Sequence, residues 1–147
     1  MNIFYIDESP IQIAKALVDK HIVKMPLESA QMLSTAKRLL DGKPVSVIHW
    51  RNGKPKENVL HLLPGESYKI FTLPNKDGFD ELNNSVRYCN QKCYAVAHAR
   101  HPSTVWTMAN RANYQWHYEL FVEMMKEYSR RYNRKHQCEQ LMHFLSF

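Results

Sequence analysis

The sequence predicts a mainly α fold: a compact, single-domain helical bundle (residues 1–147) with a small β-hairpin or β-meander insertion at approximately residues 43–76. Three observations predict it. Apolar residues recur at helical spacing through residues 13–40 and 103–132. Between them, β-prone runs alternate with turn signals. The chain has 147 residues, 44% of them hydrophobic, which is the size of one domain with its own core.

The first helical region begins after a short β-prone run at residues 3–6. The pattern Ser9-Pro10-Ile11-Gln12 combines an N-cap, a proline suited to the first helical turn and a capping-box glutamine. Apolar spacing then continues to Asp41-Gly42, so the whole region is predicted to be helical. Pro26 lacks the N–H that a helix interior needs, and we expect a kink or two abutting helices there.

The central region has β character and then returns to helix. Asn52-Gly53 is a hairpin signal between β-prone runs, and Pro64-Gly65 marks a second turn. We expect residues 80–97 to be helical, although several asparagines weaken that pattern.

The strongest helical pattern spans residues 103–132, with Ser103 as its expected N-cap and a break near Asn110. A further helix is expected near 136–146. One apolar stripe of the long helix recurs every four residues: Ala112, Trp116, Leu120, Met124 and Tyr128.

Composition excludes several classes of protein. The sequence contains no apolar run of the length that a transmembrane helix needs, and its first residues lack the basic start of a signal peptide. We therefore expect no membrane partner. Three cysteines (Cys89, Cys93 and Cys138) are an odd count that fits a reducing compartment, so we expect a cytoplasmic protein. The net charge of +6 favours phosphate-bearing partners without proving them, because solubility alone also explains such a charge.

The first candidate site is a polar face on the first helical region. Its residues follow helical steps from the segment Asp19-Lys20-His21: His21, Lys24, Glu28 and Gln31. One interpretation is a solvated stripe with a weak Lys24–Glu28 ion pair. The other is a cleft, because a histidine, an acid, a lysine and an amide gather on a helix that is otherwise apolar on more than one side.

The second candidate site surrounds the start of the long helix. His98 and His101 lie beside Arg100 at a helix entrance, which would suit a phosphate. Further along are residues that could line a substrate or contact nucleic acid, although aromatic residues at helical spacing more often belong to a core: Trp106, Arg111, Asn113 and Trp116.

The third candidate site is basic and lies at the end of the long helix. Its cations are interleaved with tyrosines, as on surfaces that bind phosphates: Lys126, Arg130, Arg131, Arg134 and Lys135. Cations at a helix C-terminus also offset the helix dipole, so a structural role is the alternative. The spacing of Cys89, Cys93, His98 and His101 is too tight for the usual zinc arrangement, and we expect neither a metal nor a cofactor.

Two of these segments resemble a known family. Asp19-Lys20-His21, with Glu28 seven residues after the histidine, resembles the Asp-x-His…Glu segment of the phage pyrimidine-dimer DNA glycosylase (endonuclease V) family. His101-Pro102, followed by a long helix that ends in Arg130-Arg131, resembles the family's His-Pro element and its Arg-Arg helix end. The chain is also similar to small uncharacterised phage proteins with an Asp-Lys-His-x-x-Lys-Met…Glu-x-x-Gln segment and a His-Pro-Ser…Trp segment.

The resemblance implies a helical enzyme that acts on a nucleobase of DNA or of a nucleotide, in the host cytoplasm if the protein is viral. It makes Glu28 the acid/base, with His21 and Asp19 orienting and His101 on the opposite wall. The family's nucleophile is an α-amine on a small residue. Position 2 here is Asn, so three nucleophiles stay open: the N-terminal amine, Lys24 activated by burial, or water. The alternatives are a non-catalytic nucleic-acid-binding accessory protein and a hydrolase of a free or modified nucleotide. The oligomeric state stays open.

Overall fold

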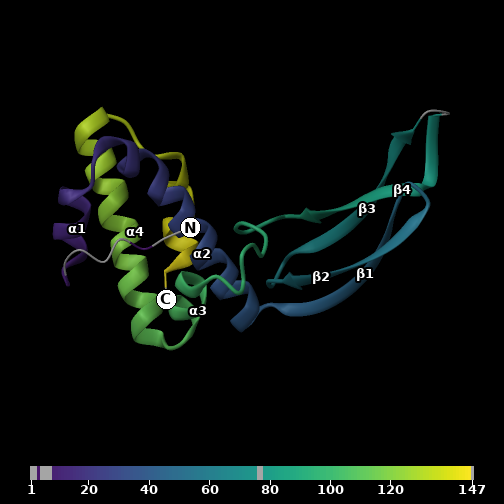
Figure 1. Ribbon diagram of the computed structural model, residues 1–147, viewed down its shortest axis with the longest axis horizontal. Coiled ribbons are helices and arrows are strands. Elements are labelled where there is room, and N and C mark those ends of the chain that lie inside the picture. The colour runs from purple at the N-terminus through teal and green to yellow at the C-terminus, as the bar shows by residue number, and fades with distance from the viewer. Residues whose placement is uncertain (1–2, 4–7, 76–77, 147) are drawn as a thin grey trace. The chain divides into compact units, whose positions relative to one another are not determined.

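The computed structural model describes residue 3, residues 8–75 and residues 78–146, and divides the chain into two compact units. Residues 1–40 and 93–147 form one, here called the helical unit, and residues 41–92 form the other, the β unit. Both are visible in Figure 1, the helical unit with labels α1 to α4 and the β unit with labels β1 to β4. The predicted β-prone run at residues 3–6 falls mostly outside the described residues.

The helical unit is built from the segments that the apolar spacing indicated. Its elements are α1 (Pro10–Ala16), α2 (Asp19–Asp41, the last residue of which opens the β unit), α3 (Pro102–Met108), α4 (Arg111–Tyr132), the 3-10 helix η1 (Gln137–Leu141) and α5 (Met142–Leu145). Ser9 caps α1 as expected, its Oγ accepting the Gln12 N–H at 3.5 Å. The expected break near Asn110 is confirmed, because the Asn110 side chain accepts the Asn113 N–H at 2.8 Å and starts α4.

A hydrophobic core joins three of these helices. It contains Ile13, Ala14 and Leu17 of α1, Ile22 and Met25 of α2, and Leu120, Met124 and Tyr128 of α4, with Ile3 and Trp116 packed against it. The predicted apolar stripe of α4 is therefore confirmed from Trp116 onward, whereas Ala112 is exposed. Packing on this shared apolar surface, rather than propensity alone, stabilises the helix.

Of the two outcomes expected at Pro26, a kink or two abutting helices, the division into two helices is wrong. α2 continues through Pro26, which is buried, and the break between the first two helices lies at Leu17 and Val18. Leu17 adopts an extended backbone with ψ of 141°. One missing N–H therefore does not divide a helix whose other turns are hydrogen-bonded and packed in the core.

The β unit consists of two antiparallel hairpins, β1 (Lys43–Arg51) with β2 (Lys54–Leu62) and β3 (Ser67–Asn75) with β4 (Gly78–Cys89). The Asn52-Gly53 signal is confirmed as the first turn, where both residues have the positive φ that a tight hairpin turn requires (53° and 79°). Hydrogen bonds join the hairpins, the Gly53 N–H donating to the Leu82 carbonyl at 2.9 Å and the Trp50 N–H to the Asn84 side chain at 2.8 Å.

The predicted helix at residues 80–97 is wrong. Residues 78–89 are strand β4, in which Val86 pairs with Ile70 and Tyr88 with Tyr68, so the β insertion extends well past residue 76. Two of the asparagines that weakened the helical pattern are buried, and Asn84 bonds the Trp50 backbone at 2.8 Å. Pairing with β3 overrides a weak helical spacing.

The fold is accordingly not purely α. About half of the chain is helical and 27% is strand, so the helices that pack together are accompanied by two antiparallel hairpins. Among the described helices, none is long and apolar enough to cross a membrane.

Candidate functional site

The polar face of α2 is the first place to test the sequence-based hypothesis. His21, Glu28 and Gln31 are half-buried there, whereas Lys24 and Asp19 are exposed. The faces of α2 that carry Ile22, Met25, Ser29 and their neighbours are buried, so these half-buried side chains lie at the edge of a packed helix. The stripe is therefore not fully solvated, but neither of the two pockets described below is lined by His21, Glu28 or Gln31, so the cleft stays a prediction.

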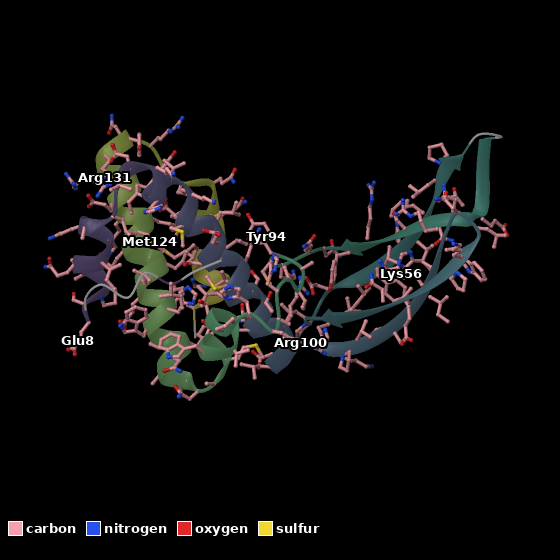
Figure 2. All side chains as sticks on the ribbon, viewed as in Figure 1. Glu8, Lys56, Tyr94, Arg100, Met124 and Arg131 are labelled. Carbon is pink, nitrogen blue, oxygen red and sulfur yellow. The ribbon has the colours of Figure 1, made fainter. Side chains whose placement is uncertain are left out.

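Two turns beyond Glu28, the same face of α2 holds the segment that leads to α3. Thr35 is fully buried, and its Oγ1 both donates to the Ala97 carbonyl at 3.2 Å and accepts the Ala97 N–H at 3.0 Å. Arg38 is also fully buried and donates through Nε to the Tyr94 carbonyl at 2.7 Å. Tyr94 is labelled on this segment in Figure 2. The segment that precedes His101 is thus fixed to α2 by side chains that the sequence analysis did not single out.

His101 begins α3. Its Nδ1 accepts the Ser103 N–H at 3.2 Å, so His101, rather than the predicted Ser103, is the N-cap. The expectation failed because a histidine ring nitrogen can replace a serine oxygen as the acceptor. His98 and Arg100 are exposed, and His98 has a left-handed backbone with φ of 51°. Arg100 is labelled in Figure 2.

A pocket of about 450 Å³ lies at the start of α3. The described residues that line it are Ile3, Pro102, Ser103, Trp106 and Trp116. The two tryptophan rings meet edge to face, with their centroids 5.6 Å apart. Part of each ring is therefore available to a ligand, while Trp116 also packs against the core.

Polar groups around this pocket hold the tryptophans in place. The Trp116 Nε1–H donates to the Glu8 carbonyl at 3.1 Å. The Asn113 amide donates to the Trp106 carbonyl at 2.8 Å, which gives Asn113 a structural role at the end of α3. Arg111 is exposed at the start of α4.

Beneath the surface lies a buried polar cluster that the sequence analysis missed. His117 is fully buried, with Nδ1 2.8 Å from the Thr107 Oγ1 and Nε2 2.9 Å from the Ser29 Oγ. Burial lowers the pKa of His117 to about 3, so the ring is neutral. No local sequence pattern predicts this cluster, because its three residues come from α2, α3 and α4.

The basic surface at the end of α4 is partly an ion-pair network. Glu127 is buried and accepts hydrogen bonds from Arg130 and from Arg131, whose Nε lies 2.9 Å from Oε1. The hydrogen bond from Arg130, helped by Arg131, lowers the pKa of Glu127 to about 2. Arg131, labelled in Figure 2, also bonds the Asp19 carboxylate at 3.0 Å. The sequence analysis assigns DNA binding to Arg131 and an orienting role to Asp19. Their ion pair also holds α2 and α4 together.

The remaining cations of this surface are accessible. Arg134 donates to the Tyr128 hydroxyl at 3.0 Å with its guanidinium over the ring, and Lys135 is exposed beside a second pocket of about 390 Å³. Arg130 keeps an exposed side chain despite its pairing with Glu127.

In the part of the chain that the structure describes, no three His, Cys, Asp or Glu side chains lie close enough together to hold a metal ion. Cys93 and Cys138 are buried and Cys89 is half-buried.

Comparison of the chain with protein-family profiles, with curated proteins and with solved structures finds no match.

Proposed function

We propose that the protein is an enzyme of DNA glycosylase or lyase type that acts on the base–sugar bond of a pyrimidine nucleotide or of DNA, with Glu28 as its acid/base. The observation that carries the proposal is the half-buried polar stripe of His21, Glu28 and Gln31 on a helix whose other faces are packed. A half-buried carboxylate is restrained by its neighbours and is still accessible to a ligand or to water, as an acid/base must be. The resemblance to the pyrimidine-dimer glycosylase family points to the same residue.

The pocket at the start of α3 supports a nucleobase as the ligand. Its volume of about 450 Å³ lies within the usual range of small-molecule sites, and Trp106 and Trp116 offer aromatic surface on which a base can stack. Thr35, on the same face of α2 as Glu28, holds Ala97, and the chain then runs through His101 to Ser103 in the pocket wall. His101 directly precedes Pro102 in the pocket wall, whereas His21, Glu28 and Gln31 are not among the described residues that line the pocket.

Of the three candidate nucleophiles, Lys24 is the least favoured. Lys24 is exposed and therefore lacks the burial by which a lysine amine is activated. The N-terminal amine lies outside the described residues. If water is the nucleophile, Glu28 takes a proton from it as its oxygen bonds to the sugar C1′, and the base leaves with the electrons of the broken bond and gains a proton. If an amine attacks C1′ instead, the base leaves with the electrons of the broken bond, the sugar ring opens as the nitrogen loses a proton, and borohydride reduces the resulting Schiff base to a stable adduct.

The test compares Glu28→Gln with Glu119→Gln, a matched change of an exposed carboxylate on α4. Base release and strand cleavage are measured on a duplex with a pyrimidine dimer, a duplex with an abasic site, and free pyrimidine nucleotides, each with and without borohydride. We expect Glu28→Gln to lower the rate at least about 100-fold, as loss of an acid/base does, and Glu119→Gln to retain it. Thermal unfolding of both variants checks that they fold. Wild-type activity in Glu28→Gln, or no turnover of any substrate by the wild type, would reject the proposal; the latter would favour the non-catalytic alternative.

A further inference from the structure

The β unit places positive side chains directly opposite one another on paired strands. Lys69 of β3 faces Arg87 of β4, and Arg51 of β1 faces Lys54 of β2. All four residues are exposed. Like charges directly opposite each other destabilise a hairpin, so an anion held between them would relieve the repulsion.

Along the regular part of each hairpin, no described acidic side chain shares a face with these pairs. Side chains alternate between the two faces of a strand, so the residues that share a face with Lys69 and Arg87 along the regular part of the hairpin are Ser67, Phe71, Ser85 and Cys89. In the first hairpin Glu57 lies on the face opposite to Arg51 and Lys54, where it accepts a hydrogen bond from Ser46 at 2.7 Å. Within the described residues, none of the four cations forms an ion pair with a carboxylate.

An aromatic ring orients one of the cations. The Arg87 guanidinium lies over the Phe71 ring, 5.1 Å from its centroid, and Phe71 is 39% exposed. Stacking of this kind restrains the flat guanidinium while leaving its N–H groups free to meet a phosphate.

Hydrogen bonds fix the two cation pairs in one frame. The tip of the first hairpin, at Asn52 and Gly53, bonds to Asn83 and Leu82 of β4 at 3.4 and 2.9 Å. Arg87 follows Asn83 by four residues, which is about 13 Å along a strand. The two pairs therefore lie on two hairpins that these hydrogen bonds join, and Lys56, labelled on β2 in Figure 2, adds a further exposed cation near the tip of the first hairpin.

We propose that the β unit binds double-stranded DNA, with backbone phosphates held between Lys69 and Arg87 and between Arg51 and Lys54. Each of the two hairpins is a two-stranded antiparallel ribbon, an element that the major groove of B-form DNA admits, whereas the major groove of duplex RNA is too deep and narrow for it. The inference rests on the proposed function in that it names duplex DNA, rather than a free nucleotide, as the form of the substrate.

The test measures binding of the full chain to a short undamaged DNA duplex by fluorescence anisotropy at a series of salt concentrations. Lys69→Glu converts a like-charge pair into an ion pair with Arg87. Its matched control is Lys43→Glu, which makes the same charge change on an exposed residue of β1 that faces Leu62. We expect Lys69→Glu to weaken binding at least 10-fold at low salt and to lower the salt slope by about 1, because the phosphate contact that is lost contributes about 0.9. Its melting temperature should stay equal to that of the wild type or rise, and Lys43→Glu should bind nearly as the wild type does.

Three results would overturn the inference: no salt-dependent binding of the duplex, equal losses in both variants, or tighter binding of duplex RNA of the same sequence. The outcomes also separate it from the proposed function. Binding that depends on Lys69 without any turnover leaves the β unit as a DNA-binding element and removes the enzyme. Turnover of DNA that Lys69→Glu does not alter retains the enzyme and removes the β unit from binding.

Discussion

Glu127 holds two arginines at the end of α4, and Glu127→Gln removes its charge while keeping its shape. Arg130 Nε lies 3.0 Å from one carboxylate oxygen and Arg131 Nε lies 2.9 Å from the other. These hydrogen bonds lower the pKa of Glu127 from 4.5 to about 2, against the opposing effect of burial. Because the pKa is lower in the folded chain than in the unfolded one, the charged carboxylate stabilises the fold.

The size of the effect follows from that shift. At about 1.4 kcal/mol per pKa unit, the stabilisation is at most about 3 kcal/mol. The Arg130 side chain is 69% exposed, and solvent screens its part of the interaction. We therefore expect Glu127→Gln to lower the free energy of unfolding by roughly 1–2 kcal/mol near neutral pH. The stabilisation is complete above the unfolded pKa of 4.5 and is lost as the pH falls toward 2.

Urea denaturation of the wild type and Glu127→Gln over this pH range measures the difference directly. The control is Glu123→Gln on the same helix, whose pairing with Lys126 at 3.2 Å is exposed and should contribute less than about 0.5 kcal/mol. The difference between wild type and Glu127→Gln should shrink as the solution is acidified. A difference that stays constant with pH, or one no larger than that of Glu123→Gln, would refute the reasoning.

Two further predictions concern buried polar groups. Burial lowers the pKa of His117 to about 3, so on acidification the unfolded chain binds a proton at this residue before the folded chain does. The free energy of unfolding therefore falls as the pH drops from 6.5 toward 3. In urea denaturation His117→Gln should make this fall shallower, and an unchanged dependence of the free energy on pH would contradict the effect. Thr35→Val should cost about 1–3 kcal/mol by leaving the Ala97 N–H and carbonyl without their partner. Thr104→Val should leave the free energy of unfolding unchanged or raise it, because the buried Thr104 hydroxyl has no hydrogen-bond partner among the described residues. Equal losses of stability in Thr35→Val and Thr104→Val would show that the hydroxyl contacts of Thr35 do not matter.

The sequence predicted helix starts and turns correctly where interactions between neighbouring residues determine them. Ser9 and Asn110 start helices by capping, and Asn52-Gly53 closes a hairpin. Residues 80–97 could not be assigned in the same way. Their apolar spacing was compatible with a helix, and only the pairing of β4 with β3 made it a strand.

The candidate site was predictable only in part. The spacing of His21, Glu28 and Gln31 placed them on one face, because helical periodicity is a property of the local sequence. The same spacing could not reveal that Lys24 is exposed, because burial depends on what packs against each position of the helix.

What the sequence by itself determined is therefore the periodic and capped segments, the polar face of α2 and the positions of the cations along the chain. Only the tertiary structure decided which of those cations are engaged. Arg131 is tied to Glu127 and Asp19, whereas Lys69 and Arg87 are left facing each other across two strands. The physical reason is that an ion pair or a strand pair joins residues distant in sequence, and its energy depends on distances that exist only after folding.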